Sequence, residues 1–65
     1  MPIMNQRCKI IASEKQLINI AIDEDITNCE GTIIYRFVDG WYDVEVEYEG
    51  SIINYDIPFD LLKFI

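Results

Sequence analysis

Two pairs of an acidic residue and a glycine, Asp39-Gly40 and Glu49-Gly50, interrupt the middle of the chain at a short interval. The segments around them are rich in β-branched and aromatic residues, which favour strands. A type I′ turn requires positive φ at both central positions, and Asp tolerates this conformation while Gly adopts it freely. Residues 31–57 are therefore predicted to form a three-stranded antiparallel meander, the wall of a small barrel.

The first of these turns, if it has two residues, fixes the register of the strands on either side of it. Val38 then faces Trp41 and Ile33 faces Val46, and alternate residues share a face. One face collects Ile33, Tyr35, Phe37, Tyr42, Val44, Val46 and Tyr48. The other collects Thr32, Ile34, Arg36, Val38, Trp41, Asp43, Glu45 and Glu47. We expect the first, apolar face to line the core and the second, charged face to meet solvent.

The second turn is expected to place Tyr48 opposite Ser51 in the same way. The residues that then join the apolar face are Ser51, Ile53, Tyr55 and Ile57. Ile52, Asn54 and Asp56 fall on the outside. This register sets Asp43 opposite Asp56, a pair of like charges, so a longer turn is the alternative.

The composition limits the size and location of the protein. A chain of 65 residues forms one domain, residues 1–65, and buries only about 60% of its unfolded surface. No apolar run approaches the ~18 residues of a membrane span, and the N-terminus does not resemble a secretory signal. These features favour a cytoplasmic location without membrane binding.

The charge and the reactive residues narrow the function. The formal net charge is −7, with 12 acidic and five basic residues, whereas nucleic-acid binders need a basic surface. We therefore expect a basic protein partner and no direct contact with nucleic acid. There is no histidine, and Cys8 and Cys29 lack metal-ligand spacing, which disfavours zinc and histidine-based catalysis. We predict no enzymatic activity, no cofactor, no metal and reduced thiols, because a disulfide needs an oxidising compartment.

The remaining segments complete a β-rich chain. Residues 6–12 alternate and predict a first strand. Residues 13–16 resemble a capping box, which would begin a helix, but the alternation of residues 17–22 favours a strand. We favour an extended excursion with Asp23-Glu24-Asp25 at its tip. Residues 59–61 predict a 3₁₀ turn, before a last strand over residues 62–65.

This order of elements is that of an SH3-like barrel. Asp39-Gly40-Trp41-Tyr42 resembles the DGWW stretch of SH3 domains, and residues 57–62 are similar to their Pro-Ser-Asn-Tyr-Val stretch. The chain has Cys-Lys-Ile-Ile-Ala in place of the ALYDY motif, and it is more similar to the small barrels of bacteria and phages. The resemblance implies an all-β fold with five strands, a long loop after the first strand and a 3₁₀ turn before the last. It also implies a peptide groove at Trp41 and Pro58, and an acidic loop, residues 23–25, that meets a basic ligand.

Trp41 is expected on the outer face, and an exposed tryptophan is often a binding anchor. The acidic row formed by Asp43, Glu45 and Glu47 has two interpretations: a docking strip for a basic partner, or a solvated face that protects the sheet from aggregation. The candidate partner-binding residues are Trp41, Asp43, Glu45, Glu47, Asp23, Glu24, Asp25 and Phe59. The sequence thus predicts a small acidic protein-binding module, in one version a phage or mobile-element inhibitor that docks on a basic surface of a host protein. The alternative is an assembly protein whose outer apolar residues form an isologous homodimer.

Overall fold

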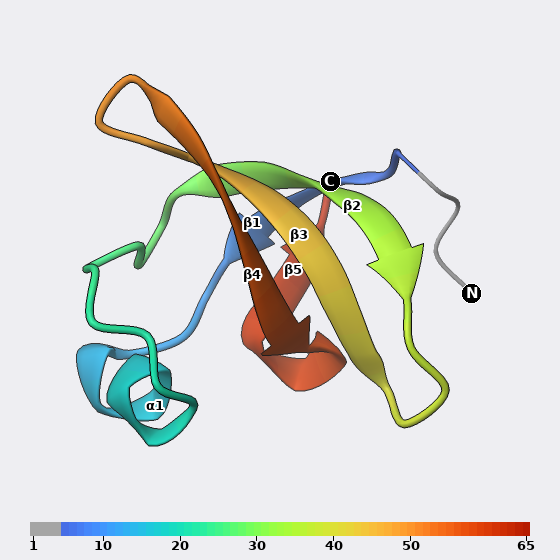
Figure 1. The fold of residues 1–65 in the computed structure, drawn as a ribbon, viewed down its shortest axis with the longest axis horizontal. Coiled ribbons are helices and arrows are strands. Elements are labelled where there is room, and N and C mark those ends of the chain that lie inside the picture. Colours follow the sequence, from blue (N-terminus) through green and yellow to red (C-terminus); the bar gives the residue numbers. More distant parts are fainter. Residues whose placement is uncertain (1–4) are drawn as a thin grey trace.

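The computed structural model describes residues 5–65, in which five antiparallel strands form one sheet (Figure 1). The elements are β1 (Arg7–Ile10), α1 (Glu14–Asn19), β2 (Glu30–Arg36), β3 (Trp41–Tyr48), β4 (Ser51–Pro58), the 3₁₀ helix η1 (Phe59–Leu61) and β5 (Leu62–Phe64). The strand order is β4-β3-β2-β1-β5. The edge strands β4 and β5 do not pair with each other within the described chain. The all-β prediction with five strands is confirmed, but hydrogen bonds do not close the sheet into a barrel.

The turn between β3 and β4 has the predicted two residues. Glu49 and Gly50 both have positive φ, 49° and 79°, as a type I′ turn requires. Tyr48 pairs with Ser51, and the register continues to the end of β4 without interruption. It includes the pair of like charges Asp43 and Asp56, so the longer turn considered from the sequence does not occur.

The turn between β2 and β3 differs from the prediction. Only Gly40 of the Asp39-Gly40 pair has positive φ, 87°, and the Phe37 N–H donates to the Trp41 carbonyl over 2.8 Å. The turn therefore contains three residues, 38–40, with glycine in the left-handed position typical of three-residue hairpins. The predicted two-residue turn and its register are wrong.

A β-bulge at Ile34 shifts the register between these strands once more. Arg36 pairs with Tyr42, but beyond the bulge Ile33 pairs with Val44. A bulge inserts an extra residue and redirects the neighbouring side chains. The bulge therefore returns Ile33 to the core, whereas Tyr35, on the turn side of the bulge, keeps the register of the three-residue turn. Tyr35, expected in the core, pairs with Asp43 on the outer face and is 55% exposed. Phe37, also expected in the core, lies next to the turn and is only half-buried.

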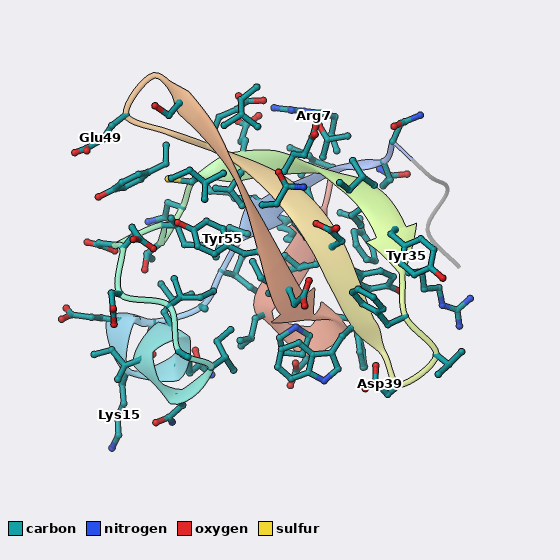
Figure 2. The ribbon with its side chains drawn as sticks, viewed as in Figure 1. Arg7, Lys15, Tyr35, Asp39, Glu49 and Tyr55 are labelled. Atoms are coloured by element: carbon teal, nitrogen blue, oxygen red, sulfur yellow. The ribbon has the colours of Figure 1, made fainter. Side chains whose placement is uncertain are left out.

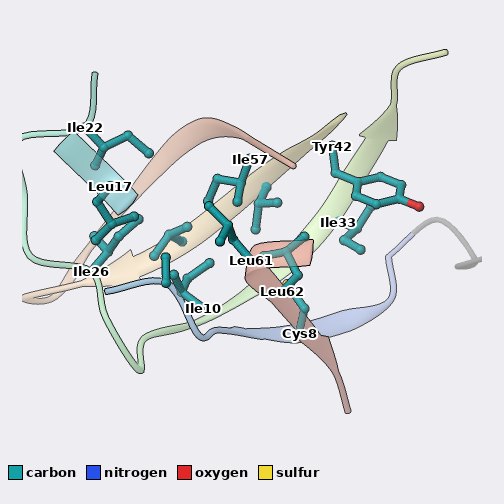
Figure 3. Close-up of a cluster of buried hydrophobic side chains, with 13 residues drawn as sticks. Cys8, Ile10, Leu17, Ile22, Ile26, Ile33, Tyr42, Ile57, Leu61 and Leu62 are labelled. Carbon is teal, nitrogen blue, oxygen red and sulfur yellow. The ribbon is translucent and has the colours of Figure 1, made fainter. Parts of the chain in front are cut away.

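The core draws on β1, α1, all the later strands and the loops (Figure 3). Its members are Cys8, Ile10, Ala12, Leu17, Ile22, Ile26, Ile33, Tyr42, Val44, Val46, Ile57, Leu61 and Leu62. Leu17, Ile22 and Ile26 group at one end, and Ile33 and Tyr42 lie at the other. The face expected for residues 42–46 is thus confirmed.

The extended excursion expected over residues 13–28 is wrong, because this segment contains helix α1. The Ser13 side chain accepts a hydrogen bond from the Gln16 N–H over 3.2 Å, and the Gln16 side chain accepts from the Ser13 N–H over 2.8 Å. This reciprocal capping box satisfies two backbone donors at the start of the helix. Leu17 then turns into the core, so the capping box outweighs the β-branched alternation.

The helix ends with a reversal that carries the chain back toward the sheet. Ala21 has φ 65°, its N–H donates to Ile18, and the Ile22 N–H donates to Leu17. This pair of bonds is a Schellman motif, and an apolar contact between its flanking residues often accompanies it. Here Leu17 and Ile22 both belong to the core. None of the helices within residues 5–65 is long and apolar enough to cross a membrane.

Candidate functional site

An open groove of about 440 Å³ lies at the turn between β2 and β3. We name it the Trp41 groove; its lining residues are Tyr35, Phe37, Val38, Asp39, Trp41 and Asp56. They come from the end of β2, the following turn, the start of β3 and the end of β4. The groove thus combines three aromatic rings with two carboxylates.

The bulge and the three-residue turn create the aromatic part of this groove. Tyr35 and Phe37 pack edge to face, with ring centroids 5.0 Å apart and an interplanar angle of 69°. Trp41 lies half-buried at the start of β3, on the face opposite the core residue Tyr42. Val38, at the tip of the turn, has a fully exposed side chain. The predicted outer position of Trp41 is therefore confirmed, and two further rings join it.

The carboxylates of the groove have no cationic partner within the described chain. Asp39 and Asp56 are exposed, and neither takes part in an ion pair among residues 5–65. Asp43, which pairs with Asp56 across the strands, accepts a hydrogen bond from the Asn54 amide over 3.2 Å. A cation over an aromatic ring gains about 0.5–2 kcal/mol, and adjacent carboxylates add to this attraction. The groove is therefore suited to a cationic group.

The predicted acidic row on β3 has two separate environments. Glu47 accepts a 2.7 Å hydrogen bond from Arg7, whose guanidinium also reaches Glu30 and Thr32 over 3.0 Å each. The hydrogen bond from Arg7 lowers the pKa of Glu47. The ion pair of Glu47 thus connects β3 to β1, whereas Asp43 pairs across the strands with Asp56, which lines the groove. Glu45, between them, faces Asn54 and Thr32.

The acidic loop at residues 23–25 is not part of the groove. Glu24 accepts a 2.8 Å hydrogen bond from the Tyr55 hydroxyl, and Asp25 accepts one from the Thr27 N–H over 3.4 Å. Figure 2 shows Tyr35 and Asp39 on one side of the molecule and Tyr55 on the other, toward α1. The sequence placed both sets in one partner surface, but the structure separates them.

Phe59 contacts the groove only indirectly. Its N–H donates to the Gly40 carbonyl over 3.0 Å, and the side chain is 58% exposed. It supports the turn from outside without lining the groove. Sequence reasoning missed Tyr35, Phe37, Asp39 and Asp56 as groove residues. If Val38-Asp39-Gly40 is interpreted as a three-residue turn, Tyr35 and Phe37 are predicted on the outer face with Trp41.

The two cysteines do not suggest a reactive site. Both thiols are free, with Cys8 buried and Cys29 half-buried. Burial raises the pKa of each thiol, which reduces the thiolate fraction that reacts. Within residues 5–65, no three cysteine or acidic side chains are close enough together to hold a metal ion.

The hydrogen bond between Tyr55 and Glu24 gives a test of the loop position. Burial, and then this hydrogen bond, raise the pKa of Tyr55 to about 12. The folded pKa exceeds the unfolded value of about 10, so this contribution to stability is present below about pH 10 and is lost as the pH rises through about 12. We expect Glu24→Gln to lower the Tyr55 pKa in an ultraviolet titration of tyrosinate. The ionisation step that disappears in Tyr55→Phe belongs to Tyr55. If this step has the same pKa in Glu24→Gln as in the original protein, the hydrogen bond between Tyr55 and Glu24 is contradicted.

Comparison with known proteins identifies no relative: no family model, curated protein or solved structure matches the chain. The Trp41 groove is therefore the feature from which function is inferred. Its rings and carboxylates come from three strands and one turn, so it depends on the complete hairpin arrangement.

Proposed function

We propose that the protein is a small SH3-like binding module that holds a cationic side chain of a protein partner in the Trp41 groove. The strand order β4-β3-β2-β1-β5 and the 3₁₀ helix before the last strand support the likeness in fold. The observation that carries the function is the groove itself, where three rings stand beside two carboxylates that no cation of the described chain neutralises.

Electrostatics favours a basic partner over other occupants. The net charge of −7 attracts a positively charged protein from a distance and raises the rate of encounter. In the groove, the face of a ring attracts a cation, and arginine can also stack its planar guanidinium on an aromatic side chain. If the protein is an inhibitor that docks on a basic surface of a host protein, that surface would present such side chains.

Self-association is the competing function. Val38 is fully exposed and Trp41 is half-buried at the same turn, so two copies could cover these apolar atoms. Each copy brings seven net negative charges to such a contact, and both would leave Asp39 and Asp56 without a cation. Light scattering at micromolar concentration distinguishes the two functions, because the monomer has a mass of 7.6 kDa.

The test of the cation site uses Trp41, the only tryptophan in the sequence, as its reporter. A short peptide with one arginine is titrated while tryptophan fluorescence is recorded, and the same peptide with neutral citrulline serves as the ligand control. We expect a saturable change with arginine that weakens as salt is added. Tyr35→Ala should weaken binding about tenfold, the factor that corresponds to a cation–π contact of about 1.4 kcal/mol.

A pair of double variants separates local from general charge effects. Asp39→Asn with Asp56→Asn removes two charges from the groove, and Asp23→Asn with Glu49→Gln removes two charges elsewhere. We expect the first pair to abolish most of the binding and the second to reduce it slightly. Equal affinity for arginine and citrulline peptides, or equal effects of the two double variants, would reject the cation site.

A further inference from the structure

Strand β4 lies at one edge of the sheet and pairs only with β3 in the described chain. We propose that the partner segment binds as an additional strand along the free edge of β4, with a lysine or arginine opposite Asp56 and an apolar side chain opposite Ile52. This inference rests on the proposed function, since it describes how the cationic side chain reaches the Trp41 groove. It adds a backbone interface and a sequence requirement for the partner.

The direction of the backbone groups of β4 follows from its turn. A two-residue turn makes Tyr48 and Ser51 a hydrogen-bonded pair, and such pairs alternate along an antiparallel ladder. The Phe59 N–H, which donates to Gly40 over 3.0 Å, shows that the same alternation extends beyond the end of β4. Odd-numbered residues therefore direct their N–H and C=O groups to β3. Those of Ile52, Asn54 and Asp56 point to the free edge.

Before Pro58, which has no N–H and protects the end of the strand, this edge has little of the protection that edge strands usually have. The strand is eight residues long, and its register with β3 has no bulge. The three residues that face outward are exposed, with Ile52 at 65%, and they include no lysine. Within residues 5–65, no backbone hydrogen bond from outside the ladder reaches these three residues. An extended peptide can satisfy such unpaired groups by strand addition.

The position of Asp56 joins the edge to the groove. Asp56 belongs to β4 and also lines the Trp41 groove. Directly opposite residues on neighbouring strands have Cβ atoms about 4.5–5.5 Å apart on the same face. A cationic residue opposite Asp56 would therefore lie beside that carboxylate, within reach of the rings. Because Ile52 precedes Asp56 by four residues, the partner needs an apolar and a basic residue separated by three others.

A second copy of this chain fits the edge less well than a basic segment. Antiparallel pairing of two β4 strands about Asn54 would set Asp56 of one copy opposite Ile52 of the other. Such pairing provides no cation for Asp56 and brings together two chains of net charge −7. The charge complementarity of the edge therefore favours a partner strand that carries lysine or arginine.

The test uses two seven-residue peptides with both ends capped and reads Trp41 fluorescence in the complete chain. Thr-Val-Thr-Thr-Thr-Arg-Thr places valine opposite Ile52 and arginine opposite Asp56 in a strand parallel to β4, and Thr-Arg-Thr-Thr-Thr-Val-Thr does so in an antiparallel strand. Each peptide is also made N-methylated at its third and fifth residues, which blocks the N–H groups that face β4 in parallel pairing, and at its second, fourth and sixth residues, which blocks those that face β4 in antiparallel pairing. For the peptide that binds, we expect the version blocked for its own direction to bind at least about tenfold more weakly than the other, and equal affinity of the two versions overturns the proposal.

Protein variants and a shifted peptide give an independent reading. The Asn54 N–H is not used by β3, so Asn54→Pro should preserve the sheet, which circular dichroism verifies, and should weaken the peptide at least about tenfold. Moving the valine one position toward the arginine puts the two side chains on opposite faces and should weaken binding likewise. If the arginine peptide binds more tightly than its citrulline form while both methylated versions bind with equal affinity, the cation site in the groove is supported and strand addition is rejected. If arginine and citrulline are equal, the proposed function itself fails.

Discussion

Replacing Gly31 with alanine is expected to cost about 3 kcal/mol of unfolding free energy, the upper part of the range for overpacked sites. A Cβ at this position would lie 2.6 Å from the Glu45 carbonyl oxygen and 2.9 Å from a methyl carbon of Val44. Gly31 is buried between its neighbours Cys8 on β1 and Val46 on β3. Because one of the obstructing atoms belongs to the backbone of β3, relief requires the strands to separate.

This loss is large for so small a domain. Typical stabilities of about 0.05–0.15 kcal/mol per residue give roughly 3–10 kcal/mol for a chain of this length, so a substantial fraction of Gly31→Ala molecules should be unfolded. Urea unfolding followed by Trp41 fluorescence measures the change. Gly50→Ala is the control, since its Cβ meets nothing within 4 Å, although its positive φ costs about 1–2 kcal/mol. If Gly31→Ala is no more harmful than this control, the close approach of the strands is wrong.

The second large effect is expected at Leu17, the residue that attaches α1 to the core. Leu17 is 1% exposed, and truncation of such a buried leucine to alanine costs about 2–5 kcal/mol through lost transfer energy and the cavity left behind. Ile18 is the next residue of the same helix but is 58% exposed. We expect Ile18→Ala to change stability by less than about 0.5 kcal/mol.

Thermal unfolding of both variants provides the measurement. A loss of about 1 kcal/mol lowers Tm by roughly 4–8 °C in a domain of this size, so Leu17→Ala should unfold at least about 6 °C below Ile18→Ala. Equal Tm values would mean that the segment does not pack as a helix against the sheet. Ile22 and Ile26, at the same end of the core, would then need another arrangement.

The two hairpins show how far a turn dipeptide predicts a register. Gly40 and Gly50 both adopt positive φ, as each Xaa-Gly pair indicated. The residue before glycine decides the turn length, and only Glu49 has positive φ as well. A left-handed glycine serves a two-residue and a three-residue turn equally. The sequence therefore predicted the β3–β4 register correctly and the β2–β3 register incorrectly.

The length of the turn at Asp39-Gly40 also determined how much of the candidate site was predicted. Trp41 and Asp43 were placed on the outer face because β3 alternates regularly, with Tyr42 and Val44 buried. Tyr35 and Phe37 were placed in the core because Asp39-Gly40 was interpreted as a two-residue turn, and because the alternation of residues 33–37 gives no sign of the bulge at Ile34 that keeps Ile33 in the core while Tyr35 faces outward. The strand pairing that creates a bulge is a long-range property, and the residues of one strand do not reveal it.

The helix and the acidic residues illustrate a different limit. The capping box at Ser13 was visible, but the alternation that follows it pointed to a strand, and burial of Leu17 decided between them. Glu47, part of the predicted acidic row, forms an ion pair with Arg7 of β1, a strand far from it in the sequence. The separation of residues 23–25 from Trp41 depends on the path of the whole excursion, which spacing along the chain does not specify.

The placement of β1 between β2 and β5 affects the order in which the molecule can assemble. A hairpin such as β3–β4, closed by two residues, forms in about 1–10 μs. The ladder that joins Cys8 to Phe64 spans almost the whole described chain, and its closure carries a larger entropic cost. During folding the outer side of the early hairpin is therefore available to other chains before the interior is complete.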